Sequence, residues 1–475
     1  MDETIISLFD VSGLCQAMAA KLIHPQGLSF SAVSTDSRKV GAGDLFFALS
    51  GERFDAHDFI PDVIARGCRG VVISREVKLP ENVTAFVVPD VLRAFGALAG
   101  AILDKRRALG NFTTFAITGS NGKTTTKELL ACCLESQGCR VLKTEGNFNN
   151  FVGMPMTVAR LTTAHDVAVL EMGANAPGEI RYLSTTARPD IALITCVGAA
   201  HLEGFGSLEG VAAAKGEMID APGLKRIVLP SETRKYYASR IPAGVESVWV
   251  GDADSGEAFR FEDIHATLDG IQFRMHTPHR DLSLSLPLLG SHNAGNLAKA
   301  VAAVLDIPQS GSDRLDETRL NAALAGIRLP SGRLERWIGL DRVSFLHDAY
   351  NANPSSMAVS LALLTQFDAP ICLILGDMRE LGPESPELHR QIGRKAAQIA
   401  PRMMLCVGEH ADDLARGAID AGLPADHILK ASSDGLDTAL EQLRPSLQPD
   451  TVCLIKGSRG VRLERVLDHF QARRG

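Results

Sequence analysis

Aromatic side chains are scarce in this chain and make up only 5% of its 475 residues. A platform on which nucleic-acid bases stack needs several of them, so the composition argues against such a surface. Net positive charge is also lacking, because 49 Lys and Arg face 56 Asp and Glu, which gives −7 at pH 7. A general binder of nucleic acid or of an anionic membrane would carry the opposite sign. We therefore expect no nucleic-acid partner.

Long apolar runs and paired cysteines are missing as well. No apolar run approaches the ~18 residues that cross a bilayer, so we expect no stable membrane insertion. The first residues are acidic and lack the basic flank of a signal peptide. Nine cysteines are scattered without a CxxC pair, which argues against a zinc ribbon and against a disulfide framework. Because such cysteines suit a reducing compartment, we expect a soluble, cytoplasmic protein, and we expect a monomer.

The chain is 45% hydrophobic and long enough for two to four domains. Short aliphatic runs alternate with helical stretches, a pattern typical of parallel sheets covered by helices. Linker-like segments near 109–111 and 329–333 divide the chain into three domains, over 1–108, 109–328 and 329–475. We expect an α/β protein with a central, mostly parallel sheet. A more alternating segment, 230–290, predicts an antiparallel extension of that sheet.

Capping residues predict where two helices begin. Asp90 precedes an apolar stripe that ends in the basic cluster 105–107, which suits a helix carboxyl terminus. Asn353 precedes Pro354, a residue that favours the first position of a helix. We expect helices to begin directly after Asp90 and Asn353.

Residues 118–126, TGSNGKTTT, join a predicted strand to a predicted helix over 123–137. Glycines in such a turn let backbone N–H groups approach phosphate oxygens, and the helix amino terminus adds positive charge. Lys123 would reach the β- and γ-phosphates, and the Thr124 hydroxyl would ligate Mg²⁺. The loop is shorter than the full Walker pattern, because Ile117 stands where that pattern has its first glycine. An ordinary glycine-rich turn is the alternative.

Three further residues are candidates for a metal site. Glu171 follows the predicted strand 167–170, and His201 follows the run 191–197, so both fall at the sheet edge where α/β proteins bind ligands. Carboxylate oxygen suits Mg²⁺, whereas imidazole is not its preferred donor. Taken alone, Glu171 also fits a solvated strand end and His201 a structural histidine. Lys215, expected at the start of a helix, would by itself be a surface lysine.

Together these segments resemble the Mur ligase family, ATP-dependent enzymes that form amide bonds in bacterial cell-wall precursors. The resemblance implies a P-loop, mononucleotide-binding central domain, an amino-terminal UDP-substrate domain and a Rossmann-like carboxy-terminal domain. It implies catalytic roles for Lys123, Glu171, His201 and Lys215, with two Mg²⁺ held by Thr124, Glu171, His201 and a carbamate on Lys215. The ATP-binding residues that it implies are Gly119, Ser120, Asn121, Gly122, Lys123, Thr124, Thr125, Asn293, Asn296, Arg333 and Asp348.

Three segments resemble the branch of the family that adds D-alanyl-D-alanine to a UDP-N-acetylmuramoyl-tripeptide: 144–155 (TEGNFNNFVGMP), 348–354 (DAYNANP) and 376–382 (GDMRELG). This implies an acyl-phosphate intermediate, release of ADP and phosphate, and a carboxy-terminal domain that binds the dipeptide. His347 stands where this branch often has a second acid. The substrate-binding residues implied are Ser34, Asp36, Ser37, Arg38, Thr144, Asn149, Asn150, Tyr350, Asn351, Asn353, Lys456, Ser458 and Arg459.

Two rival interpretations stay open at this stage. The nearer one is another amino-acid-adding ligase of the same superfamily, including folylpolyglutamate synthase; the segment 147–151 and the UDP-type first domain argue against it. The other is a P-loop kinase or nucleotide switch, which leaves the first ~105 residues and the loop 348–354 without a role. The third residue of the peptide, diaminopimelate or lysine, is left open.

Overall fold

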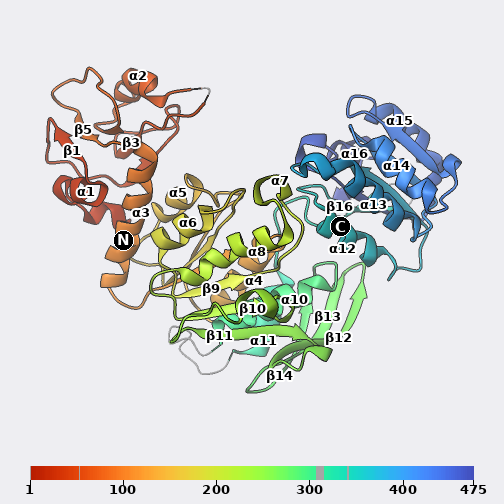
Figure 1. Cartoon of the computed structure of the whole chain (residues 1–475). Helices are drawn as coiled ribbons and strands as arrows, with labels where there is room; N and C mark the ends of the chain where they lie inside the picture. Colours follow the sequence, from red (N-terminus) through yellow and green to blue (C-terminus); the bar gives the residue numbers. More distant parts are fainter. Residues whose placement is uncertain (1, 53, 306–314, 340–341, 475) are drawn as a thin grey trace.

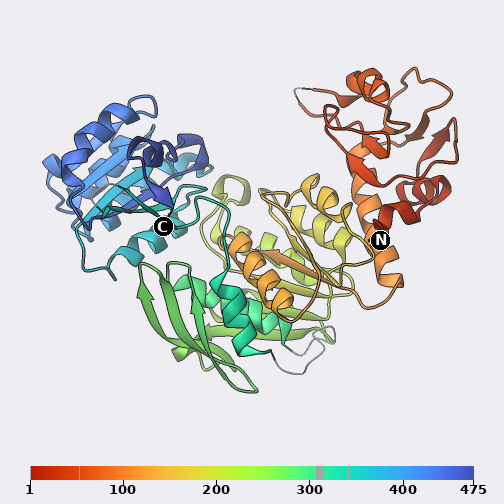
Figure 2. The ribbon, with the colours of Figure 1, turned by 180° about the vertical axis from the view of Figure 1, so that it is seen from behind.

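The computed structural model describes residues 2–52, 54–305, 315–339 and 342–474. Three α/β units follow one another along the chain, and each is built on its own sheet. The amino-terminal and carboxy-terminal units lie on opposite sides above the central unit (Figures 1 and 2). The predicted fold class is therefore confirmed, whereas the domain boundaries at 108/109 and 328/329 stay predictions. In the ranges just given, no helix is long and apolar enough to span a membrane.

The amino-terminal unit holds a five-stranded sheet in the order β1-β5-β4-β3-β2. Only β1 runs antiparallel to its neighbour, and the remaining pairs are parallel. Its elements are α1 (Val11–Met18), β1 (Lys21–Ile23), β2 (Ala32–Ser34), β3 (Asp44–Phe47), α2 (Ile60–Ala65), β4 (Gly70–Ile73), β5 (Thr84–Val87) and α3 (Val91–Ala108).

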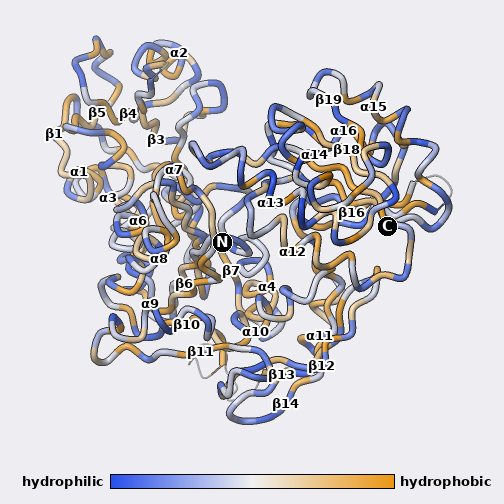
Figure 3. Tube along the Cα trace, turned by 45° about the vertical axis from the view of Figure 1, so that its right-hand side comes forward, coloured by the Kyte–Doolittle hydropathy of each residue, from blue (hydrophilic) through white to orange (hydrophobic). Residues whose placement is uncertain are grey.

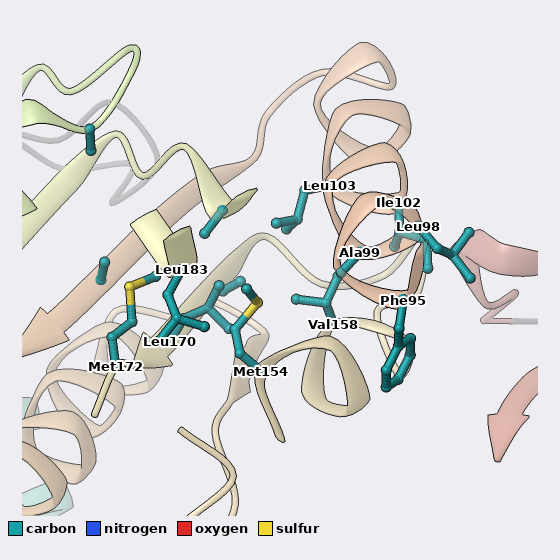
Figure 4. Packing of buried hydrophobic residues seen from close by; sticks show 14 of the residues in the cluster. Phe95, Leu98, Ala99, Ile102, Leu103, Met154, Val158, Leu170, Met172 and Leu183 are labelled. Carbon is teal, nitrogen blue, oxygen red and sulfur yellow. The ribbon is translucent and has the colours of Figure 1, made fainter. Parts of the chain in front are cut away.

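Helix α3 joins the first unit to the second. It begins where the sequence predicts, because the Asp90 carboxylate accepts a hydrogen bond from the backbone N–H of Arg93 at 3.0 Å. Ala99 and Leu103 on α3 point toward Val158 of helix α5 (Gly153–Val158) in the central unit (Figure 4). These side chains belong to one buried cluster that continues across both units, so the two units share a core.

The central unit holds nine strands in the order β14-β13-β12-β11-β10-β9-β6-β8-β7. The pairs from β7 to β12 are parallel, and β12, β13 and β14 are antiparallel, as predicted for the extension. Its strands are β6 (Thr113–Thr118), β7 (Val141–Lys143), β8 (Val167–Glu171), β9 (Ile191–Ile194), β10 (Arg226–Pro230), β11 (Glu246–Asp252), β12 (Phe259–Thr267), β13 (Gly270–His276) and β14 (Asp281–Leu286). Besides α5, its helices are α4 (Lys123–Ser136), α6 (Glu179–Ala187), α7 (Leu202–Phe205), α8 (Leu208–Lys215), α9 (Arg234–Tyr237), α10 (His292–Val304) and α11 (Glu317–Ala325).

The carboxy-terminal unit holds seven strands in the order β19-β18-β17-β20-β16-β15-β21, of which β19 to β16 are parallel. Its strands are mostly apolar and its outer turns polar (Figure 3). Helix α12 begins after Asn353, as predicted, with a reciprocal capping box between Asn353 and Ser356. The elements are β15 (Glu335–Ile338), β16 (Ser344–Asp348), α12 (Pro354–Leu364), β17 (Ile371–Gly376), α13 (Ser385–Ala397), β18 (Met403–Val407), α14 (Ala411–Asp420), β19 (Ile428–Ala431), α15 (Leu436–Leu443), β20 (Val452–Lys456), α16 (Arg465–His469) and β21 (Arg473–Arg474).

The Asp90 cap gives a test of how α3 is held. Replacing Asp90 with Ala leaves the first-turn N–H groups of α3 without this acceptor, which typically costs about 1 kcal/mol. We expect the amides of that turn to exchange roughly five-fold faster in hydrogen-exchange mass spectrometry. The control is Asp254→Ala, in an exposed turn away from any long helix. Unchanged exchange at 91–94 in the Asp90 variant would contradict the capping role.

Candidate active site

One cavity of about 1110 Å³ opens between the central unit and the carboxy-terminal unit. Its floor is formed where β6, β8 and β9 end, at the edge of the sheet at which α/β folds bind ligands. This volume is ample for a nucleotide with part of a second substrate. The predicted site residues in its wall are Ser120, Asn121, Gly122, Lys123, Thr124, Thr125, Asn149, Asn150, Glu171, His201, Asn293, Asn296, Arg333, Asp348, Tyr350, Asn351, Asn353 and Lys456.

The phosphate-binding loop runs from β6 into α4, as the sequence predicts. Gly119 has φ +143°, and a Cβ there would stand 2.0 Å from the Thr195 hydroxyl oxygen, so no side chain fits. Lys123 Nζ donates hydrogen bonds to the carbonyls of Gly119 at 2.8 Å and Ser120 at 3.3 Å. Burial lowers the pKa of Lys123 from its ordinary value. The lysine thus folds back over the loop that is expected to bind phosphate.

Thr124 and Glu171 meet at the centre of the cavity floor. The Thr124 hydroxyl donates to Glu171 Oε2 at 2.9 Å, and Asn149 Nδ2 donates to Glu171 Oε1 at 2.9 Å. Glu171 is only 2% exposed, so its interpretation as a solvated strand end is wrong. Hydroxyl and carboxylate oxygens side by side are donors that Mg²⁺ prefers. The donor set at this point therefore fits a magnesium ion.

His201 lies at the same edge, but its ring faces the other unit. It adopts a left-handed backbone conformation, with φ 53°, directly before α7. Its Nδ1 is paired with the carboxylate of Glu380, which belongs to the loop after β17 in the carboxy-terminal unit. Burial is the main cause that lowers the pKa of His201. In this conformation the imidazole contacts the carboxy-terminal unit.

Lys215 differs from expectation in two ways. It is the last residue of α8 rather than the first of a helix, and it is 1% exposed rather than on the surface. Its Nζ donates to the Ala174 carbonyl at 3.3 Å and lies 5.1 Å from the centre of the Phe205 ring. Burial, followed by the nearby Lys123 charge, lowers the pKa of Lys215 to about 7. Burial thus disfavours the charged form of this amine.

The carboxy-terminal unit contacts the phosphate loop directly. Asn353 Nδ2 donates to Asn121 Oδ1 at 2.8 Å, and Asn121 Nδ2 donates to the Ser355 hydroxyl at 2.7 Å. Because α12 is capped by the same Asn353, the start of this helix is tied to the loop. Sequence reasoning missed Ser355 and Glu380, although Glu380 lies in the quoted segment 376–382 and Ser355 follows the quoted segment 348–354.

Two basic residues of the carboxy-terminal unit are placed differently from one another. Lys456 Nζ pairs with Asp348 at 2.5 Å and is 2% exposed, so its charge is already matched. Arg333 lies in the cavity wall with its guanidinium 4.1 Å from the centre of the Tyr350 ring. Its buried Nε has no hydrogen-bond partner within the described ranges. Arg333 is thus the more available cation for an anion in the cavity.

Several predicted residues lie outside the cavity wall. Arg38 and Asp36 pair at 2.9 Å on the surface of the amino-terminal unit, and this contact lowers the pKa of Asp36 to about 2. Thr144 stands behind Glu171, where its hydroxyl accepts from the Glu171 N–H at 3.0 Å. The other predicted residues outside the wall are Ser34, Ser37, Gly119, Lys215, Ser458 and Arg459. Their roles stay predictions.

Comparison with known families and structures adds an independent finding. The Mur ligase middle domain matches residues 117–304, the Mur ligase glutamate ligase domain matches 332–459, and the Mur ligase family catalytic domain matches 29–108. A relative from Escherichia coli, named UDP-N-acetylmuramoyl-tripeptide–D-alanyl-D-alanine ligase, is 36% identical over 450 residues, which cover 94% of both chains.

Two solved structures are similar over nearly the whole length. The crystal structure of MurF from Acinetobacter baumannii superposes with a TM-score of 0.84 at 30% identity and covers 99% of both chains. The structure of MurF ligase from Thermotoga maritima in complex with ADP has a TM-score of 0.78 at 27% identity, over 93% of this chain and 97% of that one. The three-unit fold, the continuous cavity and the matches along the chain agree: this protein belongs to the Mur ligase family.

Proposed function

We propose that this chain is an ATP-dependent ligase that joins D-alanyl-D-alanine to a UDP-N-acetylmuramoyl-tripeptide. The observation that carries the proposal is a cavity whose wall combines the phosphate loop, the Thr124–Glu171 pair and residues of the loop 348–356 in the carboxy-terminal unit. A kinase or nucleotide switch has no need of that last loop. Relatives that match along nearly the whole chain are named for this tripeptide nucleotide and this dipeptide, which supports the choice of these two substrates.

The chemistry explains why a nucleotide site and an amine site share one cavity. A carboxylate is a poor electrophile, so its oxygen first attacks the γ-phosphorus of ATP, the bond to the β-phosphate oxygen breaks, and ADP leaves. The amine of the dipeptide then attacks the acyl carbon, and the tetrahedral intermediate expels phosphate while the nitrogen loses a proton. Phosphoryl transfer depends on positioning and charge neutralisation more than on covalent help from the protein.

The residues of the loop provide that neutralisation. The amino terminus of α4 directs backbone N–H groups at the phosphates. Lys123, which donates to Gly119 and Ser120 carbonyls here, would turn toward the γ-phosphate. Arg333 would approach from the carboxy-terminal unit, and its partnerless Nε supports an anion-binding role. Closure of the two units would keep water from the acyl phosphate.

The magnesium sites belong to the proposal as well. Thr124 and Glu171 would hold one Mg²⁺, since their oxygens lie 2.9 Å apart and are buried. Glu171, His201 and a carbamate on Lys215 would hold the second. When bound, Mg²⁺ neutralises phosphate charge and orients the phosphoryl group. Within the described part of the chain, no group of three His, Cys, Asp or Glu is arranged for a metal. We propose that carbamate oxygens complete the second site.

The surroundings of Lys215 favour carbamylation. Carbon dioxide reacts with an uncharged amine, which releases a proton and leaves a negatively charged carbamate. The Lys215 amine is buried, has only the Ala174 carbonyl as hydrogen-bond partner among the residues described, and its pKa is lowered to about 7. The charge of Lys123, which disfavours an ammonium here, would favour a carbamate.

The outer units would hold the two substrates. In the amino-terminal unit the UDP part would contact Ser34, Asp36, Ser37 and Arg38, and the loop with Thr144, Asn149 and Asn150 would guide the peptide toward Glu171. Tyr350, Asn351, Asn353, Ser458 and Arg459 would bind the dipeptide, with Lys456 fixing Asp348 beside them. One chain contains every unit that this scheme requires, so we propose that it acts as a monomer. We also propose that it acts in the cytoplasm, where the precursor nucleotide would be its substrate.

Phosphate release tests the proposed reaction. With MgATP, we expect turnover only when a UDP-N-acetylmuramoyl-tripeptide and D-alanyl-D-alanine are both present, because the first is the phosphoryl acceptor and the second consumes the acyl phosphate. Diaminopimelate-containing and lysine-containing tripeptides are compared under identical conditions. Phosphate release with neither substrate, or with a folate and glutamate, would reject the proposal.

A substitution in the loop separates nucleotide chemistry from substrate binding. Lys123→Ala removes the cation beside the γ-phosphate, so we expect turnover to fall by at least about 100-fold. Calorimetry should show the UDP substrate binding as tightly as in the unchanged protein, since its main contacts lie in another unit. Loss of UDP-substrate binding in this variant would mean that the assigned division of labour is wrong.

The proposed carbamate has its own test. Lys215→Ala should lower turnover by several orders of magnitude, and added formate or acetate should restore part of it by supplying carboxylate oxygens in the vacated space. In the unchanged protein, ¹³C-labelled bicarbonate should give a carbamate signal in NMR that the variant lacks. Turnover like that of the unchanged protein, or the same NMR signal in Lys215→Ala, would refute the assignment.

A further inference from the structure

Lys299 is a buried cation for which the proposed chemistry has no role. It lies on α10, is only 7% exposed, and belongs to the wall of the cavity. Across the ranges that the structure describes, its ammonium has no hydrogen bond and no ion pair within 4.0 Å. Burying an unmatched ammonium is costly, so a partner that comes with the ligand is expected.

Lys299 lies further along α10 than the residue that contacts the phosphate loop, where the base of a bound nucleotide would be expected. Asn296, one helical turn earlier, lies against the phosphate loop: a Cβ on Gly122 would stand 2.9 Å from Asn296 Oδ1. Side chains on a helix lean toward its amino terminus, and Lys299 Nζ accordingly lies 3.4 Å from where a Cβ on Gly295 would be. Its ammonium thus lies about one helical turn along α10 from the residue that contacts the phosphate loop.

The cavity wall next to this ammonium has an aromatic surface. Gly295 has no side chain, and a Cβ there would come within 3.2 Å of the Phe261 ring, which reaches across from β12. Glu232 lies just after β10, and Asp252 is the last residue of β11. Both line the same end of the cavity. Glu232 is the acidic group whose charge acts on Lys299. This part of the cavity wall therefore combines an aromatic ring, a hydrogen-bond donor and an acidic acceptor.

We propose that Lys299 reads the base of the nucleotide: its ammonium donates a hydrogen bond to a ring nitrogen of adenine, and Glu232 accepts one from the exocyclic amino group. This inference rests on the proposed ATP site and adds a residue outside the Asn293 and Asn296 motif. Adenine presents an acceptor nitrogen beside an amino donor, whereas guanine presents two acceptors on its major-groove edge. A lysine with a glutamate matches the adenine pattern.

Atom-by-atom analogues test the contact. Equilibrium binding of ATP and of 1-deaza-, 3-deaza- and 7-deaza-ATP is measured for the unchanged protein, for Lys299→Met and for the control Lys225→Met. The exposed ammonium of Lys225 pairs with Asp190 before the start of β10, at the opposite end of that strand from Glu232. We expect one analogue to bind the unchanged protein and the control roughly 10- to 100-fold more weakly than ATP. Lys299→Met should bind ATP more weakly than the unchanged protein by the same factor, and it should bind ATP and that analogue equally well.

The outcomes separate this inference from the proposed function. Failure of the unchanged protein to bind ATP would refute the proposed function itself. Binding of ATP with the same analogue ratios in Lys299→Met as in the unchanged protein would overturn the role of Lys299. Methionine fills the same space without a buried charge, so Lys299→Met should melt no lower than the unchanged protein. If its melting temperature does fall, Lys299→Gln replaces it in the binding comparison. Glu232→Gln should reduce the preference for ATP over GTP; an unchanged preference would remove Glu232 from the scheme.

Discussion

The hydrogen bond between the Thr124 hydroxyl and the Glu171 carboxylate is the point on which the rest of the active site depends. It exists because β6 and β8 are neighbours in a parallel sheet, so the loop after one strand and the last residue of the other meet at the same edge. Two residues of the segment after β7 also bind this glutamate. Asn149 donates to its carboxylate, and the Thr144 hydroxyl accepts from its backbone N–H. The phosphate loop, the oxygens proposed to hold Mg²⁺ and the loop proposed to guide the peptide thereby meet around one buried carboxylate.

The carboxy-terminal unit completes this cluster through two contacts made by different segments. Asn353 and Ser355 bind the phosphate loop through Asn121, and Glu380 binds His201. Both contacts join the nucleotide half of the cavity to the unit expected to hold the incoming dipeptide. Movement of that unit would therefore change the position of a phosphate-loop side chain and of a proposed metal ligand together. Such coupling is the arrangement that a reaction with a water-sensitive intermediate requires.

Much of the fold could be predicted because it follows from local pattern. The aliphatic runs that precede Gly119 and end at Glu171 became β6 and β8, and the caps Asp90 and Asn353 begin α3 and α12 as expected. Prediction failed where a residue's environment is made by distant segments. Lys215 follows no local rule that marks it as buried, yet Ala174, Phe205 and Glu217 surround it. The resemblance implies a substrate-binding role for Lys456, but no local pattern predicts that a neighbouring strand places Asp348 against it.

The sequence alone determined the α/β class, the phosphate loop, the helix starts and, through its motifs, the family. These features depend on spacing along the chain: the alternation of strand and helix, a glycine where the backbone needs φ near +143°, a carboxamide or carboxylate before a first turn. Only the tertiary structure decided which charges are matched and which are left for a ligand. Among the residues that the structure describes, Arg333 and Lys299 in the cavity wall have donors without a partner, whereas Lys456 is paired with Asp348. The difference arises because pairing and burial depend on which strands and helices become neighbours in space.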